Sequence, residues 1–305
     1  MEYILQTNKL CKKYKKQYAL KDVSMNIQKG DIYGFVGENG SGKTTVIRLL
    51  AGLIFPTSGS FVLFNEKNDS KDIDKARKKL GAIVETPSIY RNFSAKENLK
   101  LQCDILGIKA GENIKEVLKS VGLADMYDNN KKAGQFSLGM RQRLGIAMAL
   151  LGEPEFIVLD EPMNGLDPTG IVEIRELILK LNKENGITFL ISSHILNELA
   201  LVANRYGIIS KGKMVKEISL EELKKECRKS VVIEVNDPSK LVSTFIEYGE
   251  NVEFIEKGIK ISGLQTLNEI IEKVLKCGVE INSINTHETN IEEYYLSLVG
   301  GNNNA

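Results

Sequence analysis

The sequence lacks any apolar run long enough to cross a membrane. A membrane-spanning helix needs about 20 consecutive apolar residues. The longest candidates in this chain of 305 residues, such as LGIAMALLG, contain glycine and are bounded by charged segments. If the protein acts at a membrane, we therefore expect another chain to span the bilayer.

Cysteine is scarce and scattered. Cys11, Cys103, Cys227 and Cys277 do not have the spacing of metal ligands. The N-terminal stretch MEYILQTNKL does not resemble a cleavable signal sequence. These absences favour a protein of the reducing cytoplasm.

An excess of either charge is also missing, because 41 Lys and Arg residues nearly balance 40 Asp and Glu residues. A strongly basic chain would have suggested binding to nucleic acid or to an anionic membrane surface. We therefore expect no nucleic-acid partner.

The first part of the chain alternates strand-like and helix-like segments, a pattern typical of a parallel sheet wrapped by helices. DIYGFVG precedes a helix that is expected from Gly42, and FIVLD precedes one from about Pro168. ITFLISS precedes a helix that is expected over ILNELALVANR. We therefore predict an α/β fold.

Two further segments differ from this alternation. YILQTNKLCKKY and YALKDVSMNI, near the start of the chain, have the alternating look of an antiparallel sheet. The pattern between Asn92 and Leu151 is mostly helical. An antiparallel part and a helical part are thus expected beside the parallel sheet.

The pattern changes again after residues 210–213 (SKGK) and the charged segment SLEELKKECRK. The rest reads as β-α-β-β-α-β, the order of a small ferredoxin-like unit. We therefore predict a main domain over 1–220 and an accessory α+β domain over 221–305, and favour packing or dimer contact over small-molecule binding for the latter. The last residues, GGNNNA, predict a frayed tail.

The stretch GENGSGKT matches the phosphate-loop pattern G-x-x-x-x-G-K-[ST] between an apolar strand and a helix. Its glycines let backbone N–H groups turn toward phosphate oxygens, and the helix N-terminus adds favourable partial charge. Lys43 is expected to reach the β- and γ-phosphates, and the Thr44 hydroxyl to bind Mg²⁺. The predicted nucleotide-binding residues here are Gly37, Asn39, Gly40, Ser41, Gly42, Lys43, Thr44 and Thr45.

FIVLDEP is an apolar strand that ends in two acids. We expect Asp160 to hold the Mg²⁺ shell and Glu161 to polarise the attacking water, as phosphoryl transfer requires. An acidic strand end that caps a helix is the alternative, but it explains only one of the two acids.

These motifs alone would also fit a nucleoside kinase or a small GTPase, and FSLGM decides between the classes. Ser137 is predicted to be the N-cap of a helix whose first turn faces an anion. The chain here resembles the ATP-binding subunits of ATP-binding-cassette (ABC) transporters. Ser137 and Gly139 match the family's leucine-serine-glycine-glycine-glutamine signature, while Phe136, Leu138 and Met140 depart from it.

The resemblance covers nearly all of residues 1–220 and implies roles for three more residues. Tyr14 matches the aromatic residue that stacks on adenine, Asp167 the loop that joins two sites, and His194 the histidine that contacts the γ-phosphate. Taken alone, these residues would be read as sheet packing, a helix N-cap and a structural histidine. The resemblance also implies a cassette of the P-loop NTPase fold with a helical subdomain over about 86–151.

The resemblance further implies ATP and Mg²⁺ as cofactors and a second copy of the cassette as a partner. Two cassettes would face each other head to tail, each ATP lying between the phosphate loop of one and Ser137 and Gly139 of the other. Hydrolysis would open the pair and drive a membrane permease. The protein is then expected on the inner face of the cell membrane, held there by the permease.

Glu85, in VETPSIY, occupies the position of a family glutamine that reaches Mg²⁺. A carboxylate keeps an oxygen ligand for this cation, although Glu85 could also be a solvated loop residue. Glutamate here and the extra C-terminal domain resemble the branch for bacitracin resistance and lantibiotic immunity, which implies export of antimicrobial peptides.

Two alternatives remain open. One is a subunit for a different exported substrate. The other is a soluble ABC ATPase that acts on ribosomes or DNA. The sequence has neither the second cassette of ribosome-acting relatives nor the long coiled-coil insertion of DNA-repair relatives.

Overall fold

The computed structural model describes residues 2–227, 229–245, 252–262, 267–288 and 291–300. These residues belong to two compact units, Met1–Leu220 and Glu221–Ala305. Among the helices of these ranges, none has both the length and the apolar character that a membrane span requires.

The first unit is built on a six-stranded sheet in the order β11-β10-β4-β9-β8-β7. All neighbours are parallel except the antiparallel pair of β10 and β11. Every residue of β4, β8 and β9 is buried, as expected for strands covered on both faces. The predicted parallel sheet is therefore confirmed. Its strands are β4 (Ile32–Val36), β7 (Leu80–Ile83), β8 (Phe156–Asp160), β9 (Thr188–Ser193), β10 (Arg205–Ser210) and β11 (Lys213–Ser219).

The predicted antiparallel sheet is also present. It follows the order β2-β1-β5-β6, and β3 pairs with another part of β1. Its strands are β1 (Tyr3–Tyr14), β2 (Gln17–Val23), β3 (Asn26–Gln28), β5 (Ser58–Leu63) and β6 (Glu66–Lys67).

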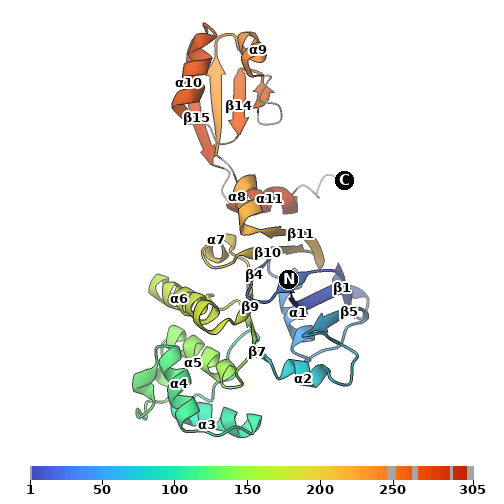
Figure 1. Ribbon diagram of the computed structural model, residues 1–305, viewed down its shortest axis with the longest axis vertical. Coiled ribbons are helices and arrows are strands. Elements are labelled where there is room, and N and C mark those ends of the chain that lie inside the picture. The colour runs from blue at the N-terminus through green and yellow to red at the C-terminus, as the bar shows by residue number, and fades with distance from the viewer. Residues whose placement is uncertain (1, 228, 246–251, 263–266, 289–290, 301–305) are drawn as a thin grey trace. The chain divides into compact units, whose positions relative to one another are not determined.

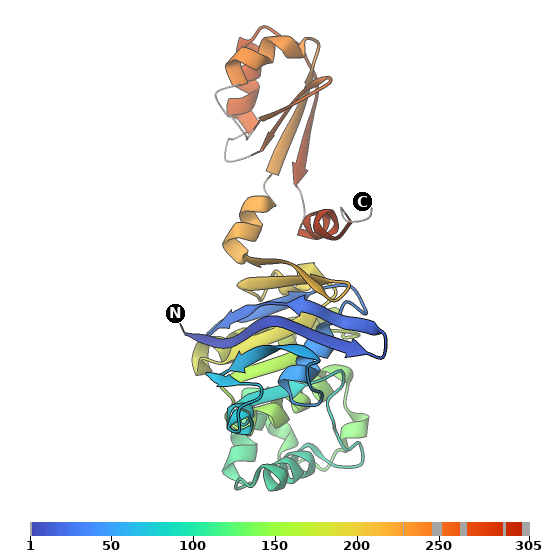
Figure 2. The same cartoon turned by 90° about the vertical axis from the view of Figure 1, so that its right-hand side faces the viewer.

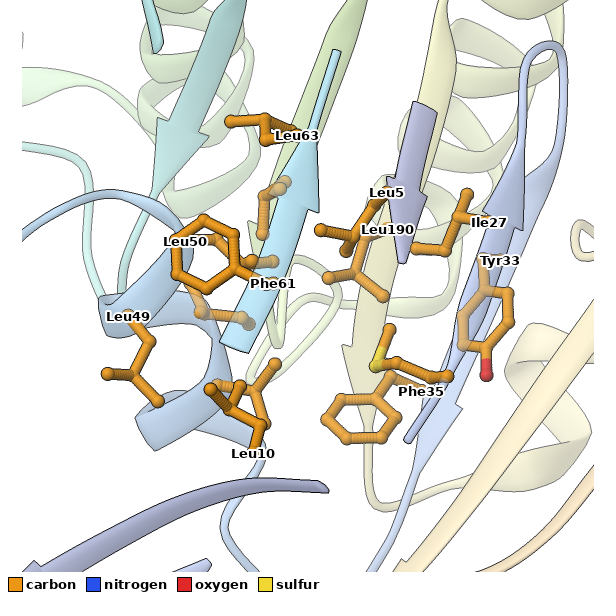
Figure 3. Close-up of a cluster of buried hydrophobic side chains, with 14 of the residues drawn as sticks. Leu5, Leu10, Ile27, Tyr33, Phe35, Leu49, Leu50, Phe61, Leu63 and Leu190 are labelled. Carbon is orange, nitrogen blue, oxygen red and sulfur yellow. The ribbon is translucent and has the colours of Figure 1, made fainter. Parts of the chain in front are cut away.

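A shared apolar core joins the two sheets to α1 (Figure 3). Leu5 and Phe61 come from the antiparallel sheet, Phe35 from β4, and Leu49 and Leu50 from α1. All five side chains are at most 1% exposed, and burying each contributes about 1.5–3 kcal/mol. Because α1 begins at Lys43, this core fixes the end of the phosphate loop.

The segment between β7 and β8 is helical, and α3, α4 and α5 gather at one end of the first unit (Figure 1). In the described part of the chain, the helices of this unit are α1 (Lys43–Leu50), α2 (Ile73–Arg77), α3 (Ala95–Leu106), α4 (Glu112–Ser120), α5 (Leu138–Leu150), α6 (Pro168–Asn185) and α7 (Leu196–Leu199), with short 3-10 turns at η1 (Ala124–Met126) and η2 (Ala133–Gln135).

The helix expected over ILNELALVANR is wrong in length, because only α7, four residues long, forms there. The backbone N–H groups of Val202 and Ala203 both donate to the carbonyl of Leu199, which closes a turn. The Asn204 side chain then accepts from the backbone N–H of Ile32 at 3.0 Å. This bond anchors the chain at the start of β4 and ends the helical run.

The second unit contains a four-stranded antiparallel sheet in the order β13-β14-β12-β15. α9 and α10 cover one face of it (Figure 2), where Phe245 and Val274 pack with Ile233 and Ile259. Its elements are α8 (Leu220–Glu226), β12 (Lys229–Val235), η3 (Pro238–Leu241), α9 (Val242–Phe245), β13 (Val252–Ile255), β14 (Gly258–Ser262), α10 (Leu267–Lys276), β15 (Ile281–Glu288) and α11 (Ile291–Gly300).

The sequence did not predict α11, which includes the first residue of GGNNNA. The rest of that expected tail, 301–305, lies outside the described residues, as do residues 246–249 of the helix expected around LVSTFIEYG.

The loop after β7 packs directly on α5. A Cβ added at Gly145 would lie 2.6 Å from both Cβ and Cγ of Pro87, closer than such atoms approach in proteins. Gly145 therefore lets the loop that carries Glu85 and Pro87 lie against the helix that begins after Ser137.

We predict that Gly145→Ala lowers the stability of the first unit. Alanine favours helix by about 1 kcal/mol, but the clash with Pro87 costs about 1–3 kcal/mol, so the net effect should be a lower unfolding midpoint. The matched control is Gly152→Ala, whose added methyl has its nearest neighbour at 3.9 Å. The test is thermal unfolding of both variants. Equal midpoints for the two single glycine variants would contradict the close approach.

Candidate functional site

The phosphate loop lies between the end of β4 and the start of α1. Gly42, the N-cap of α1, has φ of 112°, a conformation that favours glycine. A Cβ there would lie 2.8 Å from the carbonyl oxygen of Ala19, and a Cβ at Gly37 would lie 2.4 Å from that of Ile209. The two glycines therefore allow the loop to fold tightly against β2 and β10.

The other predicted loop residues differ in exposure. Asn39 and Gly40 are exposed, and Thr44 and Thr45 are half-buried. Ser41 is buried, and no described residue forms a hydrogen bond with its hydroxyl oxygen. Such a buried polar atom calls for a partner that the described chain does not supply.

Lys43 is buried, with 5% of its side chain exposed. Its ammonium donates to the carbonyl oxygens of Gly37, at 2.6 Å, and Glu38, at 3.1 Å. It also lies 3.3 Å from Oε1 of Glu161. The lysine therefore links the phosphate loop to the end of β8.

The two acids that end FIVLDEP lie where the parallel sheet predicts. Asp160 is 2% exposed, and its Oδ1 accepts a hydrogen bond of 2.6 Å from the Ser192 hydroxyl on β9. Within the described residues, no donor reaches its Oδ2. Glu161 adopts a left-handed φ of 49°, and its backbone N–H donates to the same Ser192 hydroxyl at 2.9 Å. One serine thus positions both acids.

His194 follows β9 and lies beside Glu161. Its Nδ1 is 2.8 Å from Oε2 of Glu161, and one third of its side chain is exposed. Glu198 lines a small cavity together with both residues. Burial raises the pKa of the Glu198 carboxyl, and the charge of Glu161 also raises it, while His194 and Arg175 oppose the rise.

The segment FSLGM contributes to a second wall of the site. Ser137 is the N-cap of α5, and its hydroxyl accepts from the backbone N–H of Met140 at 3.1 Å, as the sequence predicts. Ser137 is exposed and Gly139 is half-buried. The adjacent Leu138 lines a hollow of about 800 Å³ that is also lined by Thr44 and Asp160.

Asp167 and Tyr14 lie at exposed positions. The Asp167 carboxylate caps α6 by accepting from the backbone N–H of Gly170 at 3.1 Å. Tyr14 ends β1, is 46% exposed, and pairs with Gln17 across a hairpin. The following strand, β2, packs on the phosphate loop through Ala19, so this hairpin adjoins the loop.

Glu85 lines the same hollow as Thr44 and Asp160. Its side chain is 61% exposed, its backbone has a left-handed φ of 61°, and its carboxylate pairs with Arg48 of α1 at 2.5 Å. Glu85 also lines a second hollow together with Arg48. It therefore lies in the wall between the two hollows.

These residues fit a nucleotide with a divalent cation. Mg²⁺ is commonly bound through one or two carboxylates together with phosphate and water. The buried and unpaired Oδ2 of Asp160 suits that ligand set. No cluster of three or more acidic, histidine or cysteine ligands occurs in the described part of the chain. The oxygens of Thr44 and Asp160 suit a metal that phosphate also binds, and the backbone N–H groups of the loop glycines suit the phosphate.

Sequence reasoning missed three residues of this arrangement. Ser192 and Arg48 are described above, and Gln142 of α5 is 8% exposed and lines the hollow with Thr44. Ser192 was detectable in principle, since it lies in the ISSH segment at the end of a predicted strand. Arg48 and Gln142 carry no comparable signal, because their positions depend on how helices pack.

A parallel sheet, a phosphate loop between β4 and α1, and two carboxylates at the end of β8 define a P-loop nucleotide-binding protein. The comparisons place the chain within that class. The family model for ABC transporters matches residues 20–164. The bacitracin transport ATP-binding protein BcrA of Bacillus licheniformis is 42% identical over 305 residues, with 99% of both chains covered. This protein therefore belongs to the ATP-binding subunits of ABC transporters, which hydrolyse ATP.

Other similar proteins match only part of this chain, over a length close to that of the first unit. The lantibiotic transport ATP-binding protein SrtF of Streptococcus pyogenes is 42% identical over 214 residues, which covers 70% of this chain and 90% of SrtF. The dimeric cassette MJ0796, solved with ADP and Pi, is 30% identical with a TM-score of 0.63, and the match covers 71% of this chain and 98% of that one. The cassette fold predicted from the sequence is confirmed.

We predict that Ser192→Ala impairs ATP hydrolysis, although the Ser192 hydroxyl bonds Asp160 and Glu161 rather than a phosphate-loop residue in the described part of the chain. The variant removes the donor to Asp160 and the acceptor for the Glu161 backbone, so both acids lose a fixed position. Loss of such buried bonds should also cost about 1–3 kcal/mol of stability.

The control for this prediction is Ser193→Ala, since this neighbouring buried hydroxyl exchanges hydrogen bonds with the backbone of Ile195. ATPase rates and unfolding midpoints are measured for both variants. A folded Ser192→Ala protein with the wild-type rate would show that Asp160 and Glu161 do not depend on this serine.

Proposed function

We propose that this protein binds ATP with Mg²⁺ and that two copies hydrolyse it at a shared interface to power a separate membrane permease. The observation that carries the proposal is the convergence of Lys43, Asp160, Glu161 and His194 at the carboxyl edge of one parallel sheet. Full-length similarity to a bacitracin transport subunit supports the transport role.

In the proposed site, Lys43 binds the terminal phosphates, and the loop glycines offer backbone N–H groups to the remaining oxygens. Thr44, Asp160 and Glu85 would hold Mg²⁺, which would neutralise negative charge on the phosphate oxygens. Glu161 accepts a proton from the attacking water. His194 contacts the γ-phosphate and holds the Glu161 carboxylate in place, with Tyr14 against the adenine.

The second wall of the sandwich comes from the other copy. The exposed N-terminus of α5, with Ser137 and Gly139, offers backbone N–H groups and the positive end of a helix dipole to the phosphates of the partner cassette. Asp167 joins the two sites. The dimeric form of the similar cassette MJ0796 supports this arrangement.

We further propose that the transported compound is an antimicrobial peptide of the bacitracin or lantibiotic type, exported by the permease. BcrA and SrtF, both 42% identical, are transport proteins for these two classes of compound. The protein would then be peripheral on the inner face of the membrane. The alternative soluble role on ribosomes or DNA is a possible outcome of the test below.

We predict that Glu161→Gln binds ATP, hydrolyses it very slowly and accumulates as a dimer, because the water loses its base while the other contacts remain. Lys43→Ala should lose productive ATP binding, since the cation that binds the terminal phosphates is removed. Size-exclusion chromatography with ATP and Mg²⁺ measures the dimer, and filter binding measures ATP. A strictly monomeric Glu161→Gln variant would count against the shared interface.

We predict that Glu85 matters more for transport than for hydrolysis. Glu85→Gln keeps an oxygen ligand, so the ATPase rate of the purified protein should fall only modestly, whereas Glu85→Ala should cost more. Protection of cells against bacitracin should suffer more than hydrolysis in both variants, because the loop of Glu85 also lines the second hollow. If both variants protect cells as well as the parent, Glu85 is a solvated loop residue.

The partner is tested by affinity capture of the tagged protein from membranes. A co-purifying protein with several membrane spans, whose removal sensitises cells to bacitracin or a lantibiotic, would support the proposal. Co-purifying ribosomes or DNA would instead support the soluble role.

A further inference from the structure

The ammonium group of Lys43 has three oxygen partners among the described residues. It donates hydrogen bonds to the carbonyl oxygens of Gly37 at 2.6 Å and Glu38 at 3.1 Å, and it forms an ion pair with Glu161 Oε1 at 3.3 Å. Only 5% of the Lys43 side chain is exposed. A phosphate oxygen that binds this cation therefore meets a carboxylate oxygen that is already beside it.

Glu161 is the partner most easily exchanged for phosphate. The carbonyl oxygens of Gly37 and Glu38 belong to the loop backbone, whereas the carboxylate of Glu161 is carried on a rotatable side chain. Its Oε2 already has a second partner, His194 Nδ1 at 2.8 Å, so the carboxylate keeps a contact when Oε1 is released. Phosphate and carboxylate are both anions, and each would satisfy the same ammonium.

We propose that Glu161 competes with nucleotide phosphate for Lys43, so that the residue proposed to act on water also masks the cation of the phosphate site. The inference rests on the proposed function and adds a second role to one of its residues. The two roles exclude each other in time. Phosphate that takes Lys43 releases Oε1, and the carboxylate then becomes free to accept a proton while His194 holds its other oxygen.

Partial burial makes this competition measurable. Exposed ion pairs contribute little because water screens them, but attraction between charges strengthens as water is excluded. The side chains of Lys43 and Glu161 are only 5% and 20% exposed. Removing the contact should therefore increase nucleotide affinity by on the order of fivefold.

The experiment measures the affinity for ADP by isothermal titration calorimetry. ADP is not hydrolysed, so the result does not depend on turnover. Glu161→Gln removes the charge and weakens the contact with Lys43. Glu161→Asp keeps the charge but shortens the side chain by one methylene group, which withdraws the carboxylate from Lys43. We expect both variants to bind ADP more tightly than the wild type.

Two further variants separate the possible explanations. Glu198→Gln removes a nearby negative charge that lines the cavity with His194 and Glu161 but is not among the three partners of Lys43, and it should leave ADP affinity unchanged. Lys43→Ala should bind ADP much more weakly than the wild type. Circular dichroism checks that each variant is folded.

Tighter binding in Glu161→Gln but not in Glu161→Asp, or tighter binding in Glu198→Gln as well, would reduce the effect to general charge repulsion and overturn the masking. Wild-type ADP affinity in both Glu161 variants would also overturn the masking, because it would show that Glu161 does not compete with phosphate. Wild-type ADP affinity in Lys43→Ala would instead overturn the proposed phosphate site itself.

Discussion

The hydroxyl group of Ser192 is the contact on which the geometry of the site depends. It donates to Asp160 and accepts from the backbone N–H of Glu161, so one side chain on β9 joins both acids at the end of β8. The bond is possible because β8 and β9 are parallel neighbours with Asp160 opposite Ser192. It also accompanies the left-handed backbone of Glu161, a conformation that persists only where the surroundings impose it.

From this point the contacts extend to the rest of the site. Glu161 reaches Lys43 with one carboxylate oxygen and His194 with the other, which links the ends of β8 and β9 to the phosphate loop. The apolar core also fixes the position of Lys43. Lys43 begins α1, and Leu49 and Leu50 at the other end of this helix are fully buried. Packing and charge thus act on the same few residues.

The relatives divide according to how much of the chain they match. The cassettes of known structure match about 71–73% of the chain, whereas BcrA matches 99% of it. The match to BcrA therefore extends into the second unit, with its own apolar core around Ile233 and Ile259.

The sequence by itself determined the parallel sheet, the phosphate loop, the acids of β8 and the caps at Ser137 and Asp167. These features depend on residues close together in the chain, where apolar periodicity, glycine and capping side chains have direct local effects.

Only the tertiary structure decided which distant side chains meet. The pairing of Glu85 with Arg48, the bond from Ser192 to Asp160 and the shared carboxylate of Glu161 all join separate elements. The short α7 is a similar case, because the anchor of Asn204 on β4 overrides a sequence that would extend the helix. Local pattern carries no information about such contacts, since they follow from strand order and from the packing of α1 and α5 on the sheet.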